Sequence, residues 1–158
     1  MRHIISVQLE NESGALSRVS GLFSARGFNI ESLTVATTND PTMSRMTIVS
    51  IGDDNIIEQI IKQLNKLIDV VSVTDLTATE HIERELLLVK ISLKNDSQAE
   101  VDRVLDGFDA KIIDASEEAY TIELAGKSQK INDFIEAFDA DKILEVSRTG
   151  VTGVCQKI

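Results

Sequence analysis

The sequence is poor in the residues that most catalytic and metal centres require. Its 158 residues include two histidines, one cysteine and no tryptophan. A single cysteine, Cys155, excludes an internal disulfide and a thiol pair for redox chemistry or thiolate-rich metal binding. No HExxH, CxxC, GxSxG or phosphate-loop pattern occurs. We therefore assign no catalytic residue and no metal ligand, and interpret His3, His81 and Cys155 as structural or solvated positions.

Positive charge and long apolar runs are also scarce. The formal net charge is −10, so the backbone of a nucleic acid would be repelled, and we expect no nucleic-acid partner. No apolar run is long enough to span a bilayer, and the opening residues alternate instead of forming a signal-peptide core. We therefore expect a cytoplasmic protein without membrane contact. The hydrophobic fraction of 42% is ordinary for a folded globular chain.

The first half of the chain reads as strand, helix, hairpin, helix, strand. Apolar side chains alternate from Ile5 to Leu9, which predicts a half-buried strand, and turn residues then precede a helical face that runs from Leu16 to Phe23. Two runs rich in Ile, Val, Leu and Thr, Asn29 to Thr38 and Arg45 to Ile51, predict a hairpin. An amphipathic helix after Asp53 and a strand from Val70 to Leu76 follow.

The same order begins again after a charged stretch at residues 80–85. Residues 87–93 predict a strand, 101–108 a helix, 111–125 a hairpin, 131–138 a helix and 143–148 a strand. Two βαββαβ units predict an α+β protein built from tandem ferredoxin-like domains, at residues 1–79 and 80–158. Because such sheets have edge strands and one uncovered face, we expect dimerisation.

The most informative segment is the loop from Asn11 to Leu16, between the first strand and the first helix. Backbone N–H groups at a helix N-terminus can bind a carboxylate. Gly14 allows close approach of a ligand, and Asn11 offers donors and an acceptor to an amino-acid zwitterion. Simple helix capping explains the same residues, and a turn role explains Asn29, so both interpretations remain open on the residues alone.

A resemblance to a known family adds to this interpretation. The string LENESGALSRVSGLFSARGFNIESLTV, from Leu9 to Val35, resembles the N-terminal ACT domain of the small subunit of bacterial acetohydroxyacid synthase, also called acetolactate synthase. The resemblance continues through Asp40–Thr47, Gln63–Val70, Glu83–Lys90 and Glu145–Gly150, and so covers nearly the whole chain.

The resemblance implies a non-catalytic regulatory subunit in branched-chain amino-acid biosynthesis. Such a subunit activates the catalytic large subunit and binds valine for feedback inhibition. Thiamine diphosphate, magnesium and flavin are then expected only on the catalytic partner, with no cofactor in this chain. The first unit is implied to be an ACT domain, paired side by side with its copy in a homodimer. Valine is implied to bind at that interface, on six residues: Asn11, Gly14, Ala15 and Leu16 of one protomer, with Asn29 and Ile30 of the other.

Two alternatives stay open at this point. One is a free-standing amino-acid sensor of the same fold, which would act on no synthase. The other is a small enzyme that uses the open sheet face as its active site, which the scarcity of histidine and cysteine disfavours.

Overall fold

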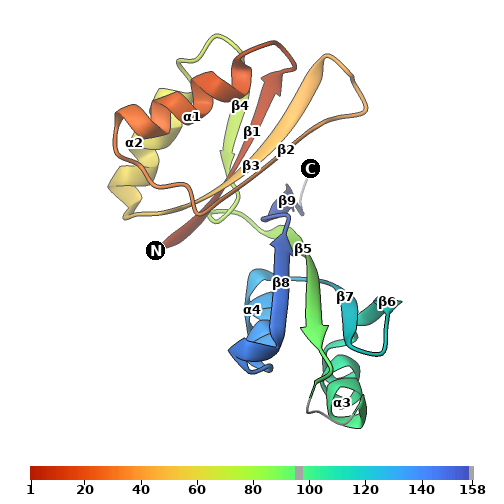
Figure 1. The fold of residues 1–158 in the computed structure, drawn as a ribbon. Helices are drawn as coiled ribbons and strands as arrows, with labels where there is room; N and C mark the ends of the chain where they lie inside the picture. The colour runs from red at the N-terminus through yellow and green to blue at the C-terminus, as the bar shows by residue number, and fades with distance from the viewer. Residues whose placement is uncertain (95–97, 157–158) are drawn as a thin grey trace. The chain divides into compact units, whose positions relative to one another are not determined.

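The computed structural model describes residues 1–94 and 98–156, and these residues form two α+β units (Figure 1). The first unit contains residues 1–83 and takes up the chain again at Val151, and the second contains Arg84–Gly150. Each unit has an antiparallel sheet with two helices, in the expected order βαββαβ. The predicted fold class is confirmed.

The first unit has a sheet of order β2-β3-β1-β4. Its central strand, β1, pairs with β3 over its whole length and with β4 on the other side, so β2 and β4 are the edge strands. Both helices lie on one face of this sheet (Figure 1). The elements are β1 (Arg2–Glu10), α1 (Ala15–Ala25), β2 (Ser32–Thr37), β3 (Met43–Ile51), α2 (Asp54–Leu64) and β4 (Val70–Asp75).

The core of the first unit follows the predicted periodicities. Alternate residues of β1 point toward the helices and are buried: Ile5, Val7 and Leu9. Helix α1 meets them with side chains spaced four and three residues apart, so that one face is buried from Ala15 to Phe23. Helix α2 contributes a second apolar stripe from Ile57 to Leu64. Burial of these stripes holds the loop between β1 and α1 at one end of the sheet.

The second unit repeats this plan with a sheet of order β6-β7-β5-β8. Its core joins the inward-facing residues Leu87, Val89 and Ile91 of β5 to the helices. There Phe134 makes T-shaped contacts with the rings of Phe108 and Phe138. The elements are β5 (His81–Ser92), α3 (Gln98–Phe108), β6 (Lys111–Ala115), β7 (Ala119–Gly126), α4 (Ser128–Glu136), a short 3-10 turn η1 (Ala140–Lys142) and β8 (Ile143–Arg148).

The C-terminal segment from Val151 belongs to the first unit. We had expected all residues from 80 onward to lie in the second. A further strand, β9 (Thr152–Cys155), pairs with β5, and the Gln156 N–H donates to the Glu80 carbonyl at 2.8 Å. Val151 is buried with Ile4, Val49 and Leu76 on the sheet face away from the helices. Burial of Val151 against these three residues explains why the chain returns to the first unit after it has completed the second.

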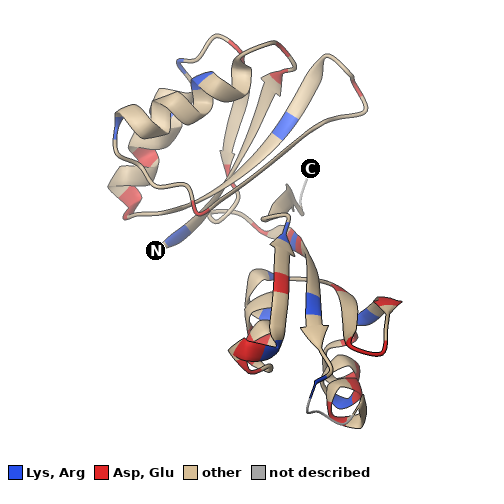
Figure 2. Ribbon diagram, in the orientation of Figure 1, with Lys and Arg blue, Asp and Glu red and all other residues tan. Residues whose placement is uncertain are grey.

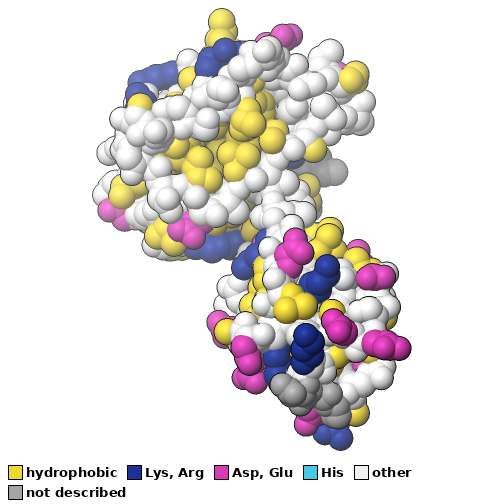
Figure 3. All heavy atoms as spheres, in the orientation of Figure 1, with side chains coloured by type: hydrophobic (Ala, Val, Ile, Leu, Met, Phe, Trp, Pro, Cys, Tyr) yellow, Lys and Arg dark blue, Asp and Glu magenta, His cyan; other side chains and the backbone are white. Residues whose placement is uncertain are grey.

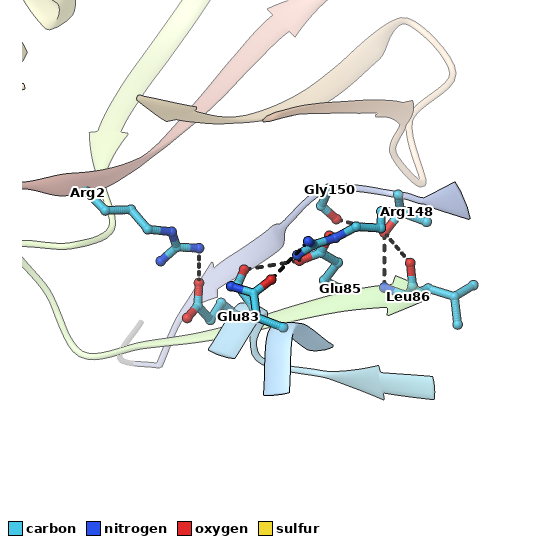
Figure 4. Close-up of polar contacts among 9 residues, drawn as sticks. Arg2, Glu83, Glu85, Leu86, Arg148 and Gly150 are labelled. Atoms are coloured by element: carbon cyan, nitrogen blue, oxygen red, sulfur yellow. Dashed lines mark hydrogen bonds and ion pairs between the residues drawn. The ribbon is translucent and has the colours of Figure 1, made fainter. Parts of the chain in front are cut away.

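The charged stretch at residues 80–85, expected to mark the boundary between the two units, is mostly strand. It forms the start of β5, and its members make specific polar contacts (Figure 4). Within the first unit Arg2 pairs with Glu83 at 3.0 Å. Within the second, the buried carboxylate of Glu85 accepts two hydrogen bonds from Arg148, at 2.7 and 2.9 Å, and one from Ser128 at the start of α4. The hydrogen bonds to Glu85 raise the pKa of Arg148, and together with the Ser128 bond they tie α4 to β5 and β8.

Charged side chains are distributed over both units. Acidic residues are scattered over helices, strand ends and turns and do not form a single stripe (Figure 2). In the described part of the chain, no helix has the length and apolar character needed to cross a membrane.

Candidate ligand-binding site

Helix α1 begins without a side-chain cap. Its N-cap is Gly14, whose φ of 85° lies in the left-handed region that glycine adopts at little cost. The first N–H groups of a helix have no intrahelical acceptor, and glycine has no side chain to supply one. In α1 the Ala15 N–H donates to the Glu12 carbonyl at 3.2 Å, and no side chain caps the helix. The first turn of α1 also contains no acidic side chain. The positive end of the helix dipole is therefore left for an anion from elsewhere.

The loop that leads into α1 is fastened on one side to the turn between β2 and β3. The Asn11 N–H donates to the Thr42 carbonyl at 2.7 Å, and the Asn11 side-chain amide donates to the Pro41 carbonyl at 3.0 Å. Asp40 accepts from both the backbone N–H and the hydroxyl of Thr42, and these bonds hold the pKa of Asp40 below its usual range. The Asn11 side chain therefore supports the loop by bonding to Pro41, and it does not cap α1.

On the other side, the loop is fastened by an ion pair that the sequence analysis did not identify. Arg18 of α1 donates through Nε and Nη2 to the two carboxylate oxygens of Asp69, in the turn before β4. Hydrogen bonds from Arg18 hold the pKa of Asp69 below its usual range. Asp69 stands 51 residues from Arg18, so no spacing rule links the two.

A hollow of about 310 Å³ opens beside the start of α1. It lies between the end of β1, the first residues of α1 and the end of β2, and hydrophobic side chains reach the surface between α1 and the sheet (Figure 3). Two large apolar side chains on it are exposed, Leu16 at 44% and Val35 at 36%. The lining residues are Leu9, Glu10, Asn11, Glu12, Ala15, Leu16, Val35, Ala36, Thr37 and Ser44.

The hollow brings together three kinds of chemistry. The α1 N-terminus suits a carboxylate, Glu10 and Glu12 are acceptors for an ammonium group, and the apolar side chains suit an aliphatic group. A pocket with a mainly apolar wall and a few polar groups is the usual form of a small-molecule site. This hollow can therefore hold a zwitterion with an apolar side chain.

The six site residues expected from the sequence form two groups. Asn11, Ala15 and Leu16 line the hollow, and Gly14 begins the helix next to it. Asn29 and Ile30 follow the other end of α1, which is 11 residues long and so spans roughly 16 Å. The exposed Asn29 amide donates to Glu31 at 2.9 Å, and the half-buried Ile30 packs against the core. One protomer does not bring the two groups together.

Other candidate chemistry is sparse among residues 1–94 and 98–156. No group of three or more histidine, cysteine or carboxylate side chains there is arranged to hold a metal ion. His3 is buried, with Asp75 at 3.5 Å and Asp54 at 3.7 Å from its ring nitrogens. His81 is held by the Thr79 carbonyl at 2.9 Å, and Cys155 is exposed.

Comparison with known proteins agrees in both halves of the chain. Residues 5–72 match the family model of the AHAS small subunit-like ACT domain, and residues 84–157 match the model of the small subunit of acetolactate synthase. The small subunits of acetolactate synthase isozyme 3 from Salmonella typhimurium and Escherichia coli are each 55% identical to this chain. Both alignments cover 98% of this chain and 95% of the relative.

A solved structure gives the same result. The crystal structure of the acetolactate synthase small subunit from Thermotoga maritima is 37% identical, with a TM-score of 0.91, and the match covers 100% of this chain and 99% of that one. The two family models together take in both units, and the relatives match over nearly their full length. The chain therefore belongs to the acetolactate synthase small-subunit family, and it is a non-catalytic regulatory subunit with an N-terminal ACT domain.

Proposed function

We propose that this subunit binds valine at the hollow beside α1 and, through it, controls the activity of a catalytic large subunit. The observation that carries the proposal is the uncapped N-terminus of α1 next to an apolar wall and two carboxylates. Valine supplies the matching carboxylate, branched aliphatic group and ammonium. Leu16 and Val35 are the side chains that would pack against its methyl groups.

The proposed site is shared between two copies of the chain. Strand β2 is an edge strand with β3 as its one neighbour in the sheet, and β2 carries the exposed Val35 on the wall of the hollow. A two-fold dimer that pairs two such edges places the same patch on both protomers. The far end of α1 in one protomer can then lie at the hollow of the other, which brings Asn29 and Ile30 to the ligand.

Regulation follows from binding at such an interface. A ligand shifts a conformational equilibrium only by its different affinities for the two states, so valine must meet different interfaces in the active and inhibited assemblies. By reciprocity, valine then changes the affinity of the small subunit for the large one. Thiamine diphosphate, magnesium and flavin belong to the large subunit in this proposal, and the small subunit contributes activation and valine sensitivity.

Mixing the two subunits tests the regulatory role. The small subunit alone should form no acetolactate from pyruvate, and adding it to its cognate large subunit should raise the rate. Valine should lower the rate of the mixture more than that of the large subunit alone. An unchanged rate on mixing would sink the proposal.

A mixed dimer tests the shared site. Asn29→Ala should weaken valine binding by about 1 to 3 kcal/mol, the cost of losing a hydrogen-bonding partner of a buried polar group. In a purified heterodimer of an Asn11→Ala chain and an Asn29→Ala chain, one interface site carries both changes and the other neither. Calorimetry should then find about half the wild-type number of valine sites at near-normal affinity. A site contained within one protomer would leave no normal site in that dimer.

A further inference from the structure

The pair Arg18–Asp69 holds the start of α1 from the side opposite the hollow. The Arg18 Nη2 donates to Asp69 Oδ1 at 3.0 Å and to the Ser13 carbonyl at 3.3 Å, so the guanidinium links the turn before β4 to the loop before α1. The same group also touches the helix cap. A Cβ built on Gly14 would lie 3.0 Å from Arg18 Nη1, so the guanidinium is packed against the backbone at the cap.

Asp69 fixes the other end of the same loop. Its backbone carbonyl accepts from the Glu10 N–H at 2.8 Å, at the last residue of β1. Asp69 is therefore bonded through its main chain to the last residue of β1 and through its side chain to Arg18 of α1, which in turn reaches the loop at Ser13. The carboxylate of Asp69 is 9% exposed, and its bidentate bonds to an arginine fork allow little angular freedom.

Neither Arg18 nor Asp69 is among the described residues that line the hollow. Their effect on a ligand must pass through the residues that they hold. Those residues are Ser13 and Gly14, which lead into the start of α1, where no side chain caps the helix. Sites held by a supporting shell bind well because the geometry is present before the ligand arrives.

We propose that Arg18 and Asp69 are positioning residues that preset the N-terminus of α1 for the carboxylate of an amino acid. This inference rests on the proposed function and adds two residues to it. The planar fork of arginine is the required feature. Lysine keeps the charge but cannot make two parallel hydrogen bonds to Asp69 while also reaching Ser13.

Calorimetry of the full-length chain with valine tests this assignment. Arg18→Met should weaken valine binding about tenfold or more, as expected when a site loses the shell that supports it. The matched control is Arg148→Met, which removes an equally bidentate arginine from Glu85 in the second unit and should leave the affinity for valine unchanged. Compared with Arg18→Met, Arg18→Lys should recover more of the lost thermal stability than of the lost affinity for valine.

The outcomes separate this inference from the proposed function. If the wild-type chain binds valine and Arg18→Met binds it equally well, the positioning role is wrong while the proposed function stands. Full recovery of affinity by Arg18→Lys would also overturn the role, because charge alone would then suffice. Should Arg18→Met fail to fold, Asp69→Asn provides the same comparison, since it keeps the size and the backbone bond of Asp69. No valine binding by the folded wild type would overturn both.

Discussion

Helices α1 and α2 of the first unit have the same length and cover the same sheet, yet they begin in opposite ways. Helix α2 starts after Asp53, whose carboxylate accepts from the Ile56 N–H at 2.9 Å, and its first turn contains Asp54. Helix α1 starts at Gly14, which offers no side chain. The chain uses the favourable end of the dipole for stability in α2 and leaves it open in α1. This unequal capping within one unit is one of the observations on which the proposed valine site at α1 rests.

The largest expected effect comes from supplying α1 with a carboxylate of its own. Gly14→Asp should weaken valine binding by about a hundredfold, or roughly 3 kcal/mol, because a charged hydrogen bond to the ligand is replaced by a like-charge contact. Valine inhibition of the reconstituted enzyme should be lost while activation persists. The control is Gly21→Asp on the same helix, where an added Cβ meets nothing within 4 Å. If both variants keep normal inhibition, valine binds elsewhere.

A smaller effect is expected from opening the capped helix. Asp53→Ala should lower the free energy of unfolding by about 1 kcal/mol, the typical contribution of an N-cap. Urea denaturation measures this loss, and calorimetry should find an unchanged affinity for valine. A fall in affinity comparable to that of Gly14→Asp would show that the two helix ends are not independent.

The smallest expected effect is the contribution of the Arg18–Asp69 pair to stability at low pH. Because Arg18 lowers the pKa of Asp69 in the folded chain, the pair stabilises the fold above the ordinary carboxyl pKa. That stabilisation is lost as the pH falls from about 4 through the lowered value. In urea denaturation between about pH 2.5 and 6, Asp69→Asn should show a shallower acid decline than wild type. Parallel pH profiles for the two proteins would contradict this role of the carboxylate.

Periodicity predicted most of the fold because the core of each unit is built from regular stripes. The alternation of Ile5, Val7 and Leu9 and the spacing from Ile57 to Leu64 identify their elements directly. Strand β9 was missed because it is short, contains Gly153 and pairs with a strand far away in sequence. The charged start of β5 was expected only to mark the boundary between the units, because the residue that neutralises Glu85, Arg148, lies 63 residues later in the sequence.

The candidate site was also predictable in part, where it depends on local sequence. The turn residues before α1 indicated a loop with free N–H groups, and Asn11, Ala15 and Leu16 do line one hollow. The contribution of β2 to its wall depends on which strands are neighbours, and the Arg18–Asp69 pair depends on a turn 51 residues away. Such contacts are set by tertiary packing and leave no local pattern in the sequence.

The return of the chain to the first unit has a consequence for biosynthesis. Ile4, Val49 and Leu76 receive Val151 as their cover only after the whole second unit has left the ribosome. Until then, this apolar face of the nascent domain is exposed to water, chaperones and neighbouring chains. The second unit, by contrast, is continuous in sequence and can fold as soon as β8 emerges. We therefore expect the regulatory domain, although it is synthesised first, to be the last part of the chain to mature.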